Sequence, residues 1–267
     1  MPARMLSIAR MTRPLSDLRG PVRALFSDVA GTMTTGDRIE ASTYEALERL
    51  GDAGIPVVMV TGRPAGFGHA FMKMTPVLAC VTENGGVTFV REGRKLNKIY
   101  GVPAASLPEW RRRMNEGVVE VTSKVPGARL STDSKYREVD LAIDWNEDNH
   151  LSREDAEHCV RILSKAGFLA VRSSTHVNFG PPHFDKLSAS MNVVRQVLGG
   201  DANDLSQYVF VGDALNDAPM FGAFPTSVGV ANVKQWWDEL AFKPAFLTER
   251  PEGAGLRELV THIMSLR

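Results

Sequence analysis

The chain has 267 residues, of which 31 are basic, 31 are acidic and 43% are hydrophobic, so it is long enough for one large domain or two modest ones. Its zero formal net charge argues against a dedicated nucleic-acid-binding protein, which normally carries a basic excess. The two cysteines, Cys80 and Cys159, argue against a disulfide scaffold or a cysteine-rich zinc site and favour a reducing, cytoplasmic location. No apolar run reaches the ~18 residues that span a membrane, so we expect no membrane partner.

The N-terminal segment differs in composition from the rest of the chain. Residues 1–23 hold five arginines and a single acidic residue, Asp17, a composition that is also found in transit peptides. The simpler interpretation is a flexible tail over residues 1–20, since chain termini are commonly poorly ordered.

Continuous apolar runs predict the strands of a parallel sheet that is covered on both faces. In chain order these strands are expected at residues 22–28, 55–60, 77–82, 208–213, 226–230 and 245–247. Helices are expected from Ser42 to Gly54, with Glu45 completing a capping box, and over residues 186–198 and 256–264. This succession predicts an α/β protein with a doubly wound, Rossmann-like core made of residues 21–84 and 183–267.

The intervening block, residues 85–182, has a different pattern. Its strands alternate between apolar and polar residues, which predicts a sheet with one buried face and one solvent-exposed face. Strands are expected at 87–91, 95–100, 118–124, 137–144, 169–173 and 176–179, and helices at 106–116 and 152–166. This block is predicted to be a smaller α/β domain inserted into the core.

Polar groups follow the predicted parallel strands at the sheet edge where ligands bind in such folds. Asp28 and Asp213 each end a strand, and Asp217 follows in the next turn. Clustered carboxylates without sulfur or imidazole suit Mg²⁺. Thr61 and Gly62 supply a hydroxyl and a bare backbone N–H, which suit phosphate oxygens, and a lysine opens a later helix at position 186.

Four motifs carry a family resemblance. They are Asp-Val-Ala-Gly-Thr-Met-Thr at residues 28–34, Val-Thr-Gly-Arg at 60–63, Asp-Lys at 185–186 and Val-Gly-Asp-Ala-Leu-Asn-Asp at 211–217. Together they resemble the haloacid dehalogenase superfamily of phosphohydrolases. The place of the insert, Glu-Asn-Gly at 83–85 and Lys-Tyr-Arg-Glu at 135–138 resemble its subclass with an α/β cap after the second motif. Within it, the chain looks most like the branch of sucrose-phosphate and mannosyl-3-phosphoglycerate phosphatases.

The resemblance implies a role for each matching residue. Asp28 would be the nucleophile that forms an aspartyl-phosphate. Asp28, Asp213 and the backbone carbonyl of Ala30 would hold Mg²⁺, with Asp217 in support. The residues implied to hold the phosphoryl oxygens are Thr61, Gly62, Lys186 and Asn216.

Position 30 departs from the family pattern, which has a second aspartate there as general acid and base. Ala30 keeps its carbonyl but has no proton to give, and such catalysis is typically worth about 10² to 10⁴ in rate. Three explanations stay open: a substitution made to trap a complex or a recent natural loss, a phosphonate-cleaving hydrolase, or a natural non-hydrolytic or slow member that binds or senses a sugar phosphate. The second fits poorly, because too few residues separate Asp28 from Thr61 for that hydrolase's cap. His183 is a candidate replacement acid.

The predicted function is therefore Mg²⁺-dependent hydrolysis of a small sugar or polyol phosphate, impaired by Ala30. The alternatives are a sugar-phosphate-binding or regulatory protein and, less favoured, a phosphonate-cleaving hydrolase. Substrate contacts are expected mainly from the cap, and the candidates are Arg63, Asn84, Arg137, His176 and Asn178. The sequence leaves the oligomeric state open.

Overall fold

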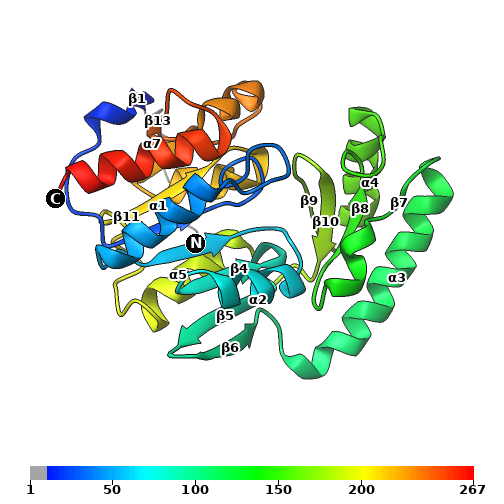
Figure 1. Ribbon diagram of the computed structural model, residues 1–267. Helices are drawn as coiled ribbons and strands as arrows, with labels where there is room; N and C mark the ends of the chain where they lie inside the picture. Colours follow the sequence, from blue (N-terminus) through cyan, green and yellow to red (C-terminus); the bar gives the residue numbers. More distant parts are fainter. Residues whose placement is uncertain (1–10) are drawn as a thin grey trace.

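The computed structural model describes residues 11–267 and contains two sheets (Figure 1). The larger sheet has nine strands in the order β1-β13-β12-β11-β2-β3-β4-β5-β6. The pairs from β1 to β4 are parallel, and β5 and β6 join as an antiparallel extension. The strands are β1 Arg13–Pro14, β2 Ala24–Ser27, β3 Val57–Val60, β4 Ala79–Thr82, β5 Val87–Glu92, β6 Lys95–Tyr100, β11 Tyr208–Gly212, β12 Thr226–Gly229 and β13 Phe246–Leu247.

Helices cover both faces of this sheet, which confirms the predicted doubly wound core. On one face lie α1 Ala41–Asp52, α2 Ala65–Met74 and α7 Glu252–Ser265, and on the other lie α5 Lys186–Gln196 and α6 Ala218–Ala223. Successive strand residues feed the two apolar layers in turn, so that Leu25 packs under the first set of helices and Phe26 under the second. Continuous apolar runs correctly predicted these strands, because both faces of the sheet are buried.

The second sheet is antiparallel, in the order β7-β8-β10-β9, and has its own apolar core. Its elements are α3 Leu107–Lys124, β7 Arg129–Leu130, β8 Leu141–Asp144, α4 Arg153–Lys165, β9 Leu169–Arg172 and β10 His176–Gly180. Figure 1 shows α3 and α4 on the side of this sheet that faces away from the core. We call residues 107–180 the cap.

Two predictions within the inserted block were wrong. Residues 87–100 were assigned to the insert, but β5 and β6 extend the core sheet, because a tight turn after β4 lets β5 pair back along it. Residues 118–124 were expected as a strand, yet they form the last turns of α3. Met114, Gly117 and Val121 are buried on one face of that helix, and this helical spacing outweighs the β-branched residues of the segment.

The expected capping box of the first helix is also absent. The helix begins at Ala41 with Glu40 at its N-cap, and no side chain caps it. The Glu40 carboxylate instead accepts a hydrogen bond from Thr35 and pairs with Arg257 on α7. The Ser152–Asp155 cap of α4 is confirmed, since the Ser152 hydroxyl oxygen accepts a hydrogen bond from the Asp155 N–H at 3.1 Å.

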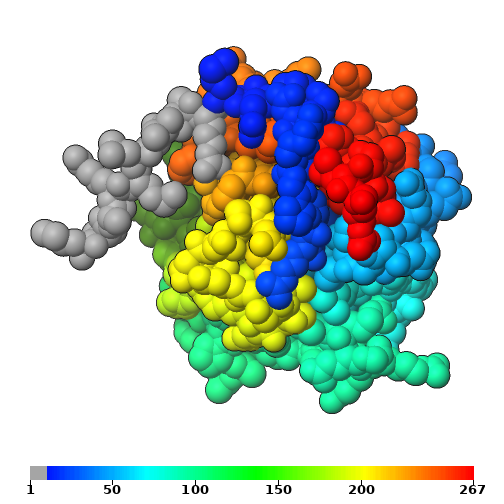
Figure 2. Space-filling model, turned by 90° about the vertical axis from the view of Figure 1, so that its left-hand side faces the viewer, coloured from blue at the N-terminus to red at the C-terminus, as the bar shows by residue number. Residues whose placement is uncertain are grey.

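The flexible tail predicted over residues 1–20 was wrong for residues 11–20, and residues 1–10 lie outside the described part. β1 pairs with β13 at the sheet edge, and Leu15 and Leu18 are buried against the core. Figure 2 shows this segment, in blue, lying along the surface beside the C-terminal helix α7, in red. Strand pairing and the two buried leucines together fix this segment on the core. Among residues 11–267, no helix has the length and apolar character needed to cross a membrane.

Candidate active site

The adjacent strands β2 and β11 bring Asp28 and Asp213 together at the carboxyl edge of the core sheet. Each aspartate follows its strand, and the register pairs Ser27 with Val211. Asp217, in the short 3₁₀ helix Leu215–Asp217, completes a buried group in which carboxylate oxygens of all three residues lie within 4.8 Å of one another. The structure thus assembles the three carboxylates predicted for the metal site.

Lys186 holds two of these carboxylates. It is the first residue of α5, where the Asp185 side chain accepts the Ser188 N–H at 2.6 Å and fixes the start of the helix. Its ammonium lies 2.8 Å from Oδ1 of Asp28 and 2.8 Å from Oδ1 of Asp217. All three groups are buried, so the helix start places one positive charge among the three acids.

The charge balance of this cluster suits a divalent cation. Burial raises the pKa of Asp28 to about 6 against the attraction of Lys186, and burial together with the neighbouring Asp28 and Asp217 raises the pKa of Asp213. Three carboxylates and one ammonium leave a net deficit of positive charge in a buried place. An all-oxygen donor set with that deficit fits a hard ion such as Mg²⁺.

Two residues that the sequence did not single out orient Asp213. The Thr32 hydroxyl donates to Oδ1 of Asp213 at 3.0 Å, and the Asn232 amide donates to Oδ2 at 2.9 Å. Asn232 also donates to the Gly31 carbonyl at 3.0 Å. Gly31 has φ +74, and a Cβ there would overlap the Asp213 carboxylate, so the turn after Ala30 needs a glycine. Thr32 belongs to the motif at residues 28–34, whereas no sequence motif around Asn232 indicates that it contacts the site.

A cavity of about 30 Å³ lies over the nucleophile position. Its core-side lining consists of Asp28, Ala30, Thr61, Gly62, Arg63, Ala214 and Asn216. Thr61 is buried, and its hydroxyl oxygen accepts the Arg63 N–H at 3.1 Å. The Asn216 Oδ1 is buried without a hydrogen-bond partner among residues 11–267. The predicted phosphate-binding groups therefore gather around one space, with Lys186 behind Asp28.

The cap closes this cavity from above. The turn between β9 and β10, residues 173–175, lines it together with His176 and Asn178. The hydroxyl-rich turn was not predicted to contact the site, because a hairpin tip gives no sequence signal of what it faces. A volume of about 30 Å³ admits little more than water. The cap in this position therefore leaves little room for a substrate.

A second contact, near the β9 end of the cap, joins cap and core. The Arg172 guanidinium lies 5.4 Å from the ring centre of Trp236 and 3.5 Å from the Glu239 carboxylate, both in the core. Arg153 of α4 pairs with the same carboxylate. These contacts hold the cap in the closed position.

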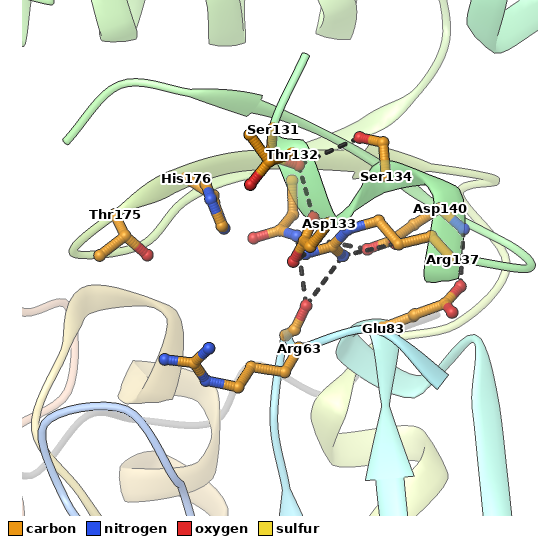
Figure 3. A network of polar contacts seen from close by, with 12 residues as sticks. Arg63, Glu83, Ser131, Thr132, Asp133, Ser134, Arg137, Asp140, Thr175 and His176 are labelled. Atoms are coloured by element: carbon orange, nitrogen blue, oxygen red, sulfur yellow. Dashed lines mark hydrogen bonds and ion pairs between the residues drawn. The ribbon is translucent and has the colours of Figure 1, made fainter. Parts of the chain in front are cut away.

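Arg137 was predicted to bind substrate, and the structure gives it a different place. Its guanidinium is buried and pairs with Asp133 and Asp140, each at 2.8 Å. It also donates to the Gly62 carbonyl at 2.9 Å. Figure 3 shows Arg137 beside Asp133 and Asp140. All of these partners are protein groups, and Arg137 does not line the cavity. A short helical turn before β8 aims it at the phosphate loop, which a residue pattern alone does not reveal.

Glu83 also joins cap and core. Its carboxylate accepts four backbone N–H groups, from Ala65 of the core at 2.9 Å and from Glu138, Val139 and Asp140 of the cap at 2.9, 2.6 and 3.0 Å. This fully buried carboxylate replaces its lost hydration with these donors. The Glu-Asn-Gly motif at residues 83–85 contains this glutamate, but the sequence did not predict that its carboxylate joins the cap to the core.

The remaining predicted substrate residues divide into two groups. Asn178 lines the cavity and lies 3.4 Å from the Gly62 carbonyl, and Arg63 lines it with Nη1 4.0 Å from Glu147. Asn84 does not line the cavity and packs beside Gly62. His183 lies on a separate cavity, with its ring edge-on to Trp110 at 5.8 Å, so it is not placed to act on the site.

Comparisons with known proteins agree with this geometry. A family model described as haloacid dehalogenase-like hydrolase matches residues 25–103. A phosphoglycolate phosphatase of Methanococcoides burtonii is 24% identical over 249 residues, covering 91% of this chain and 97% of that protein. A crystal structure from Thermoplasma acidophilum has a TM-score of 0.71 at 18% identity, covering 92% of this chain and 99% of that one. The sucrose-phosphatase of Synechocystis, solved with sucrose and phosphate, has a TM-score of 0.66 at 16% identity, with 92% and 99% covered.

The four sequence motifs and these comparisons both indicate similarity to haloacid dehalogenase-like hydrolases. The motifs surround one buried site, and the solved structures share the fold over nearly the whole chain. The chain is thus similar to the haloacid dehalogenase-like hydrolases over residues 25–103, and to phosphoglycolate phosphatases over nearly its whole length.

Proposed function

We propose that the protein hydrolyses a small phosphate monoester with Mg²⁺ and that Asp28 is the nucleophile. The observation that carries this proposal is the buried cluster of Asp28, Asp213 and Asp217, in which Lys186 contacts two of the three carboxylates at 2.8 Å. A purely structural ion pair needs no third buried carboxylate. A phosphoryl group bound beside Asp28 explains why the cluster opens onto a cavity.

The residues around the cavity divide the chemical work. An Asp28 oxygen attacks phosphorus and takes the phosphoryl group, which splits one hard displacement into two easier ones. Thr61, Asn216 and Lys186 hold the phosphoryl oxygens and stabilise the charge that develops on them. Asp28, Asp213, Asp217 and the Ala30 carbonyl would hold Mg²⁺, which would offset the negative charge of the substrate and the carboxylates when bound. The closed cap excludes water.

The substrate is proposed to be a small phosphorylated metabolite that carries hydroxyl or carboxylate groups. Arg63, Asn178 and the hydroxyl-rich turn at 173–175 line the cavity and offer donors to such groups. The sequence pattern favoured a sugar or polyol phosphate, and a related protein is a phosphoglycolate phosphatase. Arg63 suits the carboxylate of the smaller compound, so 2-phosphoglycolate belongs beside sugar and polyol phosphates in any test.

The alanine at position 30 is also compatible with a second function, the binding of a phosphorylated metabolite without hydrolysis. A chain that binds a phosphorylated metabolite without turning it over would keep the whole site and lose only the acid. The two functions differ in one measurement, the release of inorganic phosphate.

The test is phosphate release from 2-phosphoglycolate and from a panel of sugar and polyol phosphates. It is run on the parent chain and on Ala30→Asp, with Mg²⁺ and after chelation. We expect release that needs Mg²⁺ and that Asp28→Asn abolishes in both backgrounds. Binding of these compounds by calorimetry with no release from either chain would support the binding protein instead.

A further inference from the structure

The lining of the cavity offers one candidate for proton transfer besides the nucleophile itself. Of the lining residues, only Asp28, Arg63 and His176 are ionisable. Arginine stays protonated in proteins, which removes Arg63 as a proton donor. His176 comes from β10 of the cap and belongs to the type of residue that most often transfers protons in enzymes.

His176 has a carboxylate partner. Its Nε2 lies 2.9 Å from Oε2 of Glu147, and this histidine is the main reason why the pKa of Glu147 is lowered. The Glu147 N–H donates to Oδ1 of Asp144 at 2.9 Å, which fixes the loop that carries the glutamate. A carboxylate on one ring nitrogen selects the tautomer and leaves the other nitrogen for chemistry.

The backbone of His176 is fixed as well. Its N–H donates to the Ser173 hydroxyl oxygen at 3.0 Å, and its carbonyl accepts the Ser173 N–H at 2.8 Å. The ring is buried and lines the cavity, its Nε2 lies within ion-pair distance of Glu147, and no hydrogen bond found among residues 11–267 uses its Nδ1. The charged groups around the pair are Asp133, Asp144 and Arg63, two acids and one base.

We propose that His176, oriented by Glu147, is the general acid and base that replaces the aspartate missing at position 30. This inference rests on the proposed function, because it assigns the proton transfers of that reaction. The cap then carries a catalytic group, so turnover requires cap closure. His183, the replacement predicted from the sequence, lies elsewhere.

The proton transfers balance over one cycle. In the first step Asp28 forms a bond to phosphorus while the bond to the leaving oxygen breaks, and Nδ1 of the protonated His176 gives that oxygen its proton. In the second step water attacks phosphorus, the bond to Asp28 breaks, and the now neutral Nδ1 accepts a proton from the water. Inorganic phosphate leaves, and Asp28 and protonated His176 are restored.

The test is a cycle of four chains: the parent, His176→Gln, Ala30→Asp and the double variant. Phosphate release is measured on 2-phosphoglycolate and, for an activated leaving group, on p-nitrophenyl phosphate. We expect His176→Gln to slow the parent about 10² to 10⁴-fold, and to slow the Ala30→Asp chain far less, because there the aspartate supplies the proton. His183→Gln is the matched control and should leave the rate unchanged.

A second readout separates proton transfer from a structural role. Nitrophenolate leaves without a proton, so single-turnover phosphoryl transfer from p-nitrophenyl phosphate should fall much less in His176→Gln than transfer from 2-phosphoglycolate. Glu147→Gln should shift the pH profile of kcat, because it removes the charge beside the ring.

Three results overturn the inference. Equal rates of the parent and His176→Gln contradict it while leaving the proposed function intact. So does a parent that is inert when Ala30→Asp releases phosphate, since His176 then replaces nothing. No phosphate from any of the four chains overturns the proposed function and this inference with it.

Discussion

Arg137 of the cap donates a hydrogen bond from Nη1 to the backbone carbonyl oxygen of Gly62 in the core, at a distance of 2.9 Å. Gly62 lies in the loop that is proposed to hold the phosphoryl group, so the cap contacts that loop through a buried charge. Asp133 and Asp140 neutralise the charge from within the cap. Cap position and loop geometry are therefore coupled by the same side chain (Figure 3).

Arg137→Lys should lower the free energy of unfolding by about 1.5–3 kcal/mol, because one ammonium cannot replace several hydrogen bonds of a buried guanidinium. It should also lower kcat/KM, since the loop loses its support. Arg112→Lys, on an exposed helix face, is the matched control and should change stability by less than about 0.5 kcal/mol. Urea unfolding and steady-state kinetics check both. A raised KM with unchanged stability would instead mark Arg137 as a substrate contact.

Glu83→Gln should loosen the join between cap and core. The neutral amide has one acceptor oxygen where the carboxylate has two, so some of the four N–H groups that Glu83 now accepts lose their partner. We expect a loss of about 1–3 kcal/mol in the free energy of unfolding. Glu92→Gln, at an exposed strand end, should be neutral. If the two variants unfold at the same denaturant concentration, the role assigned to Glu83 is wrong.

Lys186→Met should leave Asp28 and Asp217 as buried charges without a partner. Breaking a buried pair in this way typically costs about 3–5 kcal/mol, which chemical denaturation at neutral pH without metal would measure. Added Mg²⁺ should stabilise this variant more than the parent, because it meets more uncompensated charge. Lys98→Met removes a half-exposed pair with Glu138 and should cost about 1 kcal/mol or less. Equal costs for the two lysines would argue against a special role for the cluster.

Asp140 should give the folded protein a pH dependence that a neutral isostere removes. Burial raises its pKa to about 7 against the attraction of Arg137. A carboxyl that holds its proton more tightly when folded contributes stability that is present below its unfolded pKa of ~3.9 and is lost as pH rises through the folded value.

Asp140→Asn should therefore lose less free energy of unfolding than the parent as the pH rises from about 4 to about 7. Thermal or urea unfolding across that range measures the difference. Asp37→Asn, on an exposed turn, serves as the control. The same pH slope in the parent and in Asp140→Asn would contradict the prediction.

The core of the fold was predictable because its strands are buried on both faces. Apolar continuity located β2, β3 and β11, and their shared edge then predicted that Asp28 and Asp213 would meet. The errors arose where local pattern and tertiary packing disagree. The sequence of β5 alternates between apolar and polar residues, as in a strand with one solvent-exposed face, but β5 pairs with β4 of the core sheet. Val121 is a β-branched residue that favours strands, yet it is buried on one face of a helix.

The candidate site was predictable mainly on its core side, and of the predicted cap residues His176 and Asn178 line the cavity whereas Arg137 does not. Residues next to strand ends are placed by the sheet, so their neighbours follow from topology. Cap residues reach the site through a hairpin turn and a loop, whose direction depends on how two separate cores pack. That is why the pairing of His176 with Glu147 and the inward contacts of Arg137 were visible only in the structure.

The most direct test of the account is to look for the phosphoryl group on Asp28. The parent and His176→Gln are mixed with 2-phosphoglycolate or a sugar phosphate and Mg²⁺, quenched with acid, digested and analysed by mass spectrometry. We expect a phosphorylated peptide that contains Asp28, more of it in His176→Gln once an activated substrate is used, and none in Asp28→Asn. Phosphate release without any phosphorylated Asp28, or release that persists in Asp28→Asn, would contradict the account.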